Sequence, residues 1–242
     1  MQKPKDLVIL LHGITRSNMD MMVLENRLKK EGYDTLNIKY PSTRHNLDYL
    51  ADHIYKAMGA DPRYAKAPQV HFVAHSMGGL ITRHLIYKYR PANLGKVCMM
   101  GTPNKGSEMA DFMSEHKFLS RVFEFIFGPA GPELRTDQDK VDGGVITYPL
   151  GVIASNVSLN PIGNQVFGAA NDTLVSIEST KIDGMADHIV VNSTHALMMW
   201  DPRVIDQVVS FIKTGGFDHR AVPAPRAVPE KSTPEAPQDP HP

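Results

Sequence analysis

Short apolar runs alternate with segments of helical spacing through the first hundred residues of this 242-residue chain. The apolar runs are rich in β-branched residues and carry few charges, which is typical of strands buried on both faces of a sheet. Between them, apolar residues recur three and four positions apart, as they do along one face of a helix. Alternation of this kind builds βαβ units, so the sequence predicts a doubly wound, mostly parallel sheet with helices on both faces, the α/β class.

The alternation also gives the expected domain organisation. We expect strands at residues 6–11, 35–39, 70–74, 97–100, 150–155 and 188–192, and helices at residues 19–30, 47–58, 79–89 and 202–213. After "GTPNKG" the rhythm stops, and residues 112–127 carry aromatic side chains at too many angles for an ordinary surface helix. We therefore expect residues 1–216 to form one domain, with a helical lid or cap inserted at about residues 104–147.

The end of the chain differs in composition from the rest. Residues 217–242 contain seven of the eighteen prolines, and no Phe, Trp or Tyr follows Phe217. Such a segment has little apolar surface to bury, so we expect a disordered or polyproline-like tail.

Charge and cysteine content exclude several function classes. Lys+Arg and Asp+Glu are both 26, and basic residues do not cluster with aromatic ones, so nucleic acid is not an expected partner. The single cysteine, Cys98, lies in the apolar run "KVCMMG", which predicts a buried thiol and argues against redox chemistry. The first apolar run, residues 7–11, is too short for a signal-peptide core or a membrane span. We expect a soluble cytoplasmic protein without stable membrane insertion, or a secreted or periplasmic one if a signal has been removed.

One serine stands at an abrupt change of pattern in "QVHFVAHSMGGLITRH", residues 69–84. Ser76 lies between an expected strand and an expected helix, with the small residues Ala74 and Gly78 two positions before and after it. This is the nucleophile elbow G-x-S-x-G with alanine at its first position, in which small neighbours let strand and helix approach closely. On the motif alone, a serine that merely caps the helix is an equal alternative.

A serine nucleophile needs a histidine base, a carboxylate and donors for the oxyanion. The base candidate is His195 in "DHIVVNSTHALMMW", just past an apolar run. The carboxylate candidate is Asp172 in "AANDTLVSIEST", which gives the chain order Ser, Asp, His found in this fold class. Three other carboxylates compete for this role: Asp183 in a glycine-containing turn, Asp187, and Asp201 as an expected helix cap.

The oxyanion donors are expected after the first strand, in "LVILLHGITRS". The backbone N–H groups of Ile14 and of Met77, the residue after the nucleophile, would form the oxyanion hole. His12 and Gly13 precede Ile14, and His12 fits a residue that braces this loop better than it fits a catalytic base.

Together these motifs resemble the α/β-hydrolase superfamily, and within it the bacterial lipases and esterases. The resemblance covers about residues 6–213 and rests on "LLHGI", "AHSMGG", "GTPNKGSEMADF", "NDTLVSIEST" and "STHALM". It implies hydrolysis of carboxylic esters by Ser76, His195 and Asp172 through an acyl-enzyme. An acyltransferase or thioesterase would use the same triad, and a non-enzymatic binding protein of the same fold is a further alternative.

The aromatic segment and the resemblance together give expectations about substrate and cofactors. An acyl pocket lined by Met109, Phe112, Phe118 and Phe123 would favour hydrophobic acyl chains, so we expect a small ester or lipid as substrate and transient contact with a lipid surface. Thr173 stands where the family often has glycine. Some relatives hold calcium near the histidine loop, but the spacing of Asp183 and Asp187 matches no ligand set, so we expect no metal and no cofactor.

Overall fold

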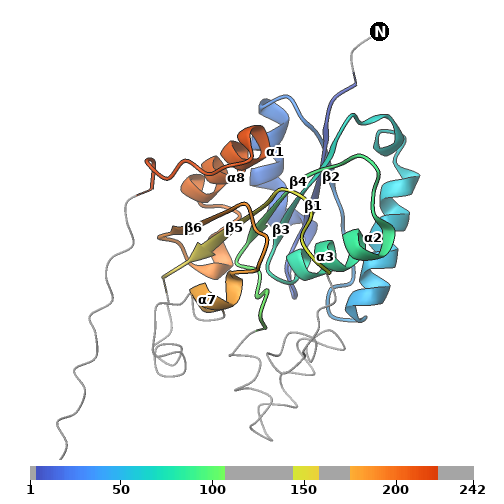
Figure 1. Ribbon diagram of the computed structural model, residues 1–242. Coiled ribbons are helices and arrows are strands. Elements are labelled where there is room, and N and C mark those ends of the chain that lie inside the picture. Colours follow the sequence, from blue (N-terminus) through green and yellow to red (C-terminus); the bar gives the residue numbers. More distant parts are fainter. Residues whose placement is uncertain (1–3, 107–143, 158–174, 223–242) are drawn as a thin grey trace, which may run out of the picture.

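The computed structural model describes residues 4–106, 144–157 and 175–222. Six parallel strands form one sheet in the order β2-β1-β3-β4-β5-β6 (Figure 1). The strands are β1 (Leu7–Leu11), β2 (Asp34–Asn37), β3 (Val70–His75), β4 (Leu94–Met100), β5 (Leu150–Ser155) and β6 (Asp187–Val191). The parallel α/β architecture expected from the sequence is confirmed.

Helices cover both faces of this sheet. Helices α1 (Met22–Lys30) and α8 (Pro202–Thr214) lie on one face, and α2 (Leu47–Ala60) and α3 (Met77–Tyr89) lie on the other (Figure 1). Side chains of β1 alternate between the two layers, with Leu7, Ile9 and Leu11 in one core cluster and Val8 and Leu10 in the other. Burial on both faces explains why this strand is a continuous apolar run.

Short helical turns complete the described structure. A 3-10 turn, η1 (Asn18–Met21), leads into α1, η2 (Tyr64–Lys66) precedes β3, α7 (Ile177–Thr180) precedes β6, and η5 (His195–Leu197) follows it. None of the helices within the described ranges has the length and apolar character needed to cross a bilayer.

The order of strands places a functional site. The chain passes from β1 to β2 on one side of it and then crosses back to form β3 on the other side. The strand order therefore reverses between β1 and β3. In open parallel sheets, ligands bind outside the carboxyl ends of the strands at such a point. The loops that follow β1 and β3, which carry Ile14 and Ser76, meet there.

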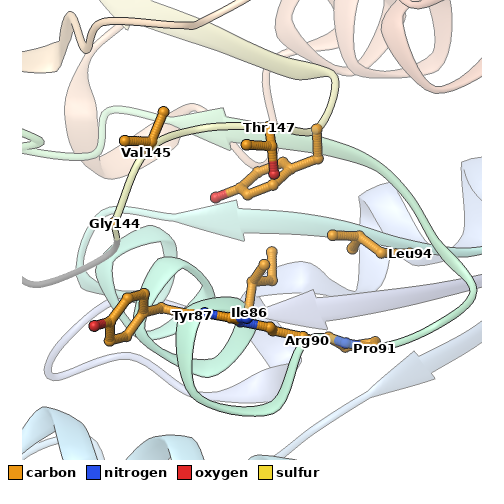
Figure 2. Close-up of a pocket in the computed structure, with 9 residues that line it drawn as sticks. Ile86, Tyr87, Arg90, Pro91, Leu94, Gly144, Val145 and Thr147 are labelled. Atoms are coloured by element: carbon orange, nitrogen blue, oxygen red, sulfur yellow. The ribbon is translucent and has the colours of Figure 1, made fainter.

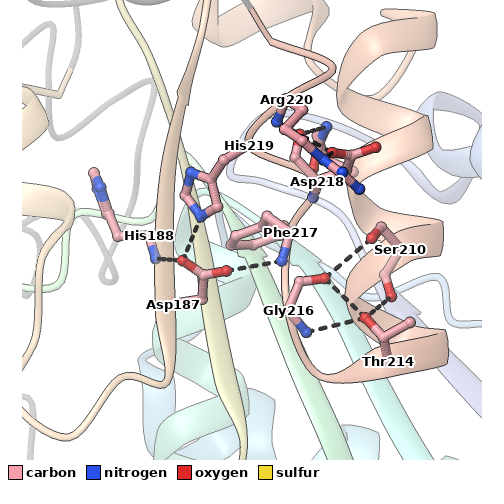
Figure 3. Close-up of polar contacts among 10 residues, drawn as sticks. Asp187, His188, Ser210, Thr214, Gly216, Phe217, Asp218, His219 and Arg220 are labelled. Carbon is pink, nitrogen blue, oxygen red and sulfur yellow. Dashed lines mark hydrogen bonds and ion pairs between the residues drawn. The ribbon is translucent and has the colours of Figure 1, made fainter.

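The first residues of the expected tail are packed against the domain. Phe217 is buried, and its backbone N–H donates to Oδ2 of Asp187 at 2.8 Å (Figure 3). Nε2 of His219 lies 2.9 Å from Oδ1 of the same carboxylate. Residues 217–222 therefore continue the domain, while residues 223–242 lie outside the described structure and their expected disorder stays a prediction. The body of the expected lid, residues 107–143, also lies outside it.

Candidate active site

Ser76 occupies a strained corner between β3 and α3. Its backbone has φ 53° and ψ −126°, a positive-φ conformation that a residue with a side chain rarely adopts. Hydrogen bonds to β4 and to the loop after it hold the corner: the Ser76 N–H donates to Met100 O at 2.8 Å, and Thr102 Oγ1 donates to Ser76 O at 3.0 Å. The backbone is thus held in a conformation typical of a nucleophile elbow rather than of an ordinary helix cap.

Small residues let three segments approach at this corner. A Cβ atom added to Gly78 would lie 2.7 Å from the carbonyl oxygen of His12, and one added to Gly13 would lie 3.1 Å from Ser76 Cβ. Ala74, the first small residue of the elbow, pairs with Leu11 in the parallel register of β1 and β3. The close contacts at Gly13 and Gly78 explain physically why the sequence has glycine at these two positions.

The two expected oxyanion donors belong to the loops that meet here. Met77 is the first residue of α3, so its N–H is among those that have no acceptor within the helix. Ile14 follows Gly13, whose backbone lies against the Ser76 side chain. Both donors therefore come from segments adjacent to Ser76, at the positive end of the α3 dipole.

His12 braces the loop before Ile14. Its ring is fully buried and stacks on Tyr40, with the ring centroids 4.0 Å apart. Nδ1 lies 2.8 Å from the carbonyl oxygen of Gly13, and the Tyr40 hydroxyl donates to the His12 carbonyl. Burial outweighs the bond to Gly13 and lowers the pKa of His12.

His195 is brought to the elbow by the loop after β6. It begins η5 and is buried, and its carbonyl oxygen lies 2.9 Å from Nε2 of His75, the residue before the nucleophile. A Cβ atom added to Gly101, which follows β4 with φ 59°, would lie only 2.9 Å from Nδ1 of His195. The imidazole of His195 thus packs against the backbone of Gly101, directly after β4. The last residue of β4, Met100, accepts the hydrogen bond from the Ser76 N–H.

The candidate carboxylate, Asp172, lies outside the described residues. Among the described residues on either side of it, the Val157 N–H donates to Ser193 O at 3.1 Å, beside the histidine loop. Helix α7 contacts the loop after β4 through a 2.7 Å bond from Asn104 Nδ2 to Thr180 O.

The three competing carboxylates have other surroundings. Asp187 opens β6, so it lies at the opposite edge of the sheet, where it binds residues 217–219 (Figure 3). Asp201 caps α8 as expected, and hydrogen bonds from Arg203 and Ser193 lower its pKa against the opposing effect of burial. Asp183 lies in the turn formed with Gly184, which has φ 84°.

The expected acyl-pocket residues Met109, Phe112, Phe118 and Phe123 lie outside the described part of the chain. Within it, a groove of about 610 Å³ runs beside the histidine loop, where Leu197, Trp200 and Val157 provide apolar lining. A second pocket of about 510 Å³ lies between the end of α3 and the amino ends of β4 and β5, lined by Ile86, Arg90 and Leu94 (Figure 2). Because it opens at the edge of the sheet away from Ser76, it is not part of this site.

Several residues that shape the site could not be identified from the motifs. The sequence assigns His75 no role of its own, does not single out Gly101, and shows Thr102 only as part of a longer motif. Arg16 is also missed: its guanidinium donates to Ala196 O at 3.3 Å, lies 3.5 Å from the Asp20 carboxylate, and lies 5.9 Å from the Trp200 ring centroid. The glycine directly after the fourth strand is a signal for close packing, but the other contacts join segments too distant in sequence to be inferred.

Known proteins resemble this chain in sequence over its first half and in fold over most of its length. A family model described as "Putative serine esterase (DUF676)" matches residues 1–118. None of the curated proteins matches the chain in sequence. Among solved structures, the chain is similar to the mature lipase BlEst2 of Bacillus licheniformis, with a TM-score of 0.68 and 16% identity over 88% of this chain and 93% of the lipase.

Two esterases from other sources are also similar in structure. The metagenomic carboxyl esterase MGS0156 gives a TM-score of 0.64 at 16% identity, covering 82% of this chain and 67% of the esterase. The esterase EaEST of Exiguobacterium antarcticum gives 0.58 at 19% identity, covering 88% and 94%. At these identities the likeness concerns the fold. The chain therefore has the α/β-hydrolase fold of bacterial lipases and esterases, as its motifs predicted, and its first 118 residues match a serine esterase family.

Proposed function

We propose that this protein is a serine hydrolase that cleaves carboxylic esters of hydrophobic acyl chains, with Ser76 as nucleophile, His195 as base and Asp172 as the acid of the triad. The observation that carries the proposal is the positive-φ backbone of Ser76 with the His195 loop bonded to the preceding residue. A helix cap would need neither feature, because capping residues ordinarily have extended backbone. The family match supports the ester-cleaving chemistry.

The reaction would proceed in two halves. His195 takes the proton of Ser76 Oγ while Oγ attacks the ester carbonyl, and the N–H groups of Ile14 and Met77 stabilise the tetrahedral oxyanion. Collapse breaks the bond to the alcohol, which leaves with the proton from His195, and the acyl group stays on Ser76. A water molecule activated by His195 then attacks the acyl-enzyme and releases the carboxylic acid. Asp172 would orient the imidazole and stabilise its protonated form.

Two features support an apolar substrate. The groove beside η5 has a mostly apolar lining, and Leu197, two residues after the base, is 46% exposed beside Trp200. Exposed apolar side chains next to a catalytic loop favour a substrate whose carbon chain covers them. A small polar ester would leave this surface in water.

The test is hydrolysis of p-nitrophenyl esters from acetate to palmitate by the wild type and by matched variants. Ser76→Ala and His195→Ala should lose at least about 10³-fold in kcat, whereas Ser210→Ala and His84→Ala, at sites away from the elbow, should retain wild-type turnover. The chain-length optimum then distinguishes an esterase from a lipase. Wild-type turnover in Ser76→Ala would refute the proposal.

The acid is tested by a second set of variants. Asp172→Asn should lower kcat about 10²–10⁴-fold because the imidazole loses its orienting partner, while Asp183→Asn and Asp187→Asn should have little effect. Adding an alcohol or amine acceptor to the wild-type reaction separates hydrolysis from acyl transfer: accumulation of the free acid alone supports the hydrolase, and accumulation of the transfer product identifies an acyltransferase.

A further inference from the structure

The side chain of His75 connects the nucleophile strand to the loop of the proposed base. His75 is the last residue of β3, next to Ser76 in the chain, and its side chain is buried. Nε2 lies 2.9 Å from the carbonyl oxygen of His195, a residue 120 positions later in the chain. The two imidazole centroids are 4.8 Å apart with the rings tilted by 53°. The His75 side chain therefore links the end of β3, next to the proposed nucleophile, to the backbone of the proposed base.

The surroundings of His75 fix its protonation state. A carbonyl oxygen only accepts, so Nε2 must carry the hydrogen. Nδ1 faces Gly13, where an added Cβ would lie 2.8 Å away, and it has no hydrogen-bond partner among the residues the structure describes. Burial first, and then the nearby His195, Arg16 and His12, lowers the pKa of His75 well below its ordinary value, against the opposing effect of the bond to His195. His75 is thus a neutral donor of one hydrogen bond.

Two contacts bear on where the His195 imidazole lies. Gly101 provides the backbone surface under its ring, and His75 holds its carbonyl. Errors of about 1 Å in the position of a catalytic group can lower turnover about a hundredfold. We infer that His75 is a positioning residue, whose Nε2–H bond to the His195 carbonyl fixes the base against the elbow. This role rests on the proposed function, in which His195 is the base.

A role in packing alone makes a different prediction, and two substitutions separate the two roles. The side-chain nitrogen of glutamine reaches the position of Nε2, whereas that of asparagine reaches only the position of Nδ1. His75→Gln can therefore keep the donor to His195, and His75→Asn cannot. Both variants are neutral amides of similar polarity, so loss of charge does not distinguish them.

The experiment measures kcat and KM for the best p-nitrophenyl ester with the wild type, His75→Gln and His75→Asn. The fraction of reactive serine in each sample is titrated with an organophosphate. We expect kcat per reactive serine to fall about tenfold in His75→Asn because one buried hydrogen bond is lost, with KM within about twofold. His75→Gln should recover most of the loss.

Each outcome decides the question. If His75→Asn turns over at the wild-type rate per reactive serine, or if His75→Gln is as slow as His75→Asn, the positioning role is wrong. A wild type that hydrolyses no ester and reacts with no organophosphate overturns the proposed function, and the role of His75 with it. An active wild type with an inactive Ser76→Ala variant leaves the proposed function standing whatever His75 does.

A measurement on the unaltered protein covers the case in which the variants do not fold. Nitrogen-15 NMR of the imidazoles should show His75 protonated at Nε2 and unprotonated at Nδ1, with no titration around the ordinary pKa of about 6.5, because burial lowers the pKa of His75 well below that value. A His75 ring that carries its hydrogen on Nδ1, or that titrates near pH 6.5, would contradict the bond to His195 and the inference.

Discussion

Substitution of Gly101 by alanine tests whether the His195 ring has to rest on the backbone beside β4. Gly101 has φ 59°, and placing alanine in that conformation costs about 1–2 kcal/mol of folding free energy. The added Cβ would also lie 2.9 Å from Nδ1 and 3.1 Å from Cε1 of His195. An ordinary contact begins near 3.4 Å, so the imidazole would have to move by about 0.5 Å. A displacement of this size should lower kcat about tenfold.

Gly32→Ala is the matched control for backbone strain. Gly32 has φ 96°, and a Cβ atom added there would meet no atom of the described residues within 4 Å. Both variants should unfold at lower urea concentrations than the wild type, each destabilised by about 1–2 kcal/mol. Only Gly101→Ala should lose turnover on the p-nitrophenyl ester at a temperature where both are folded. Equal turnover in the two variants would refute the idea that the position of the His195 imidazole depends on its contact with Gly101.

Three further outcomes are expected. Arg16→Met should lower kcat two- to tenfold, since about 0.5–1.5 kcal/mol of support from the bond to Ala196 is lost; unchanged kinetics would limit Arg16 to its surface contacts. Gly78→Ala should reduce the free energy of unfolding in urea by about 1–3 kcal/mol because its Cβ would meet two backbone carbonyls. In the control Gly59→Ala on α2, an added Cβ meets no described atom within 4 Å, so the free energy of unfolding should rise by about 0.5–1 kcal/mol. Burial lowers the pKa values of His12 and His75, so below pH 6.5 the unfolded chain binds more protons than the folded one. As the pH is lowered, the free energy of unfolding should therefore fall by up to ~1.4 kcal/mol per pH unit for each histidine. Urea titrations from pH 7.5 to 5 should show a shallower loss of stability in His75→Gln than in the wild type.

The sequence predicted the elements of the sheet because their burial leaves a clear pattern. All six strands expected from apolar runs are present, and four helices match the segments of helical spacing. Their ends were harder to predict. Helix α3 begins at Met77 rather than residue 79, because glycines in its first turn interrupt the apolar spacing. Strand β4 begins at Leu94 rather than residue 97, because Leu94 already pairs with Val70, whereas Gly95 and Lys96 interrupt the apolar run in the sequence.

In the candidate site, features set by neighbours in the sequence could be predicted, whereas contacts between distant segments could not. Ser76 could be found from its immediate neighbours, because a tight corner restricts residues two positions away. The pairing of His75 with His195 could not, since it joins loops that become neighbours only when β3, β4, β5 and β6 align. The same holds for Gly101, whose sequence context shows a glycine after a strand but not the imidazole that rests on it.

The three histidines near the elbow illustrate what contacts add to a motif. All of them follow or end a strand at the carboxyl edge of the sheet, and sequence position alone selected His195 as the base. The contacts supply a physical reason: the His12 ring is stacked on Tyr40, with Nδ1 bonded to Gly13 O, and the Nε2–H of His75 is committed to a carbonyl. Burial lowers the pKa values of both rings, which makes them poor proton acceptors for a serine at neutral pH. These contacts are consistent with the proposal that His195 is the base, and they fit His12 and His75 to the task of holding the loops that meet at Ser76.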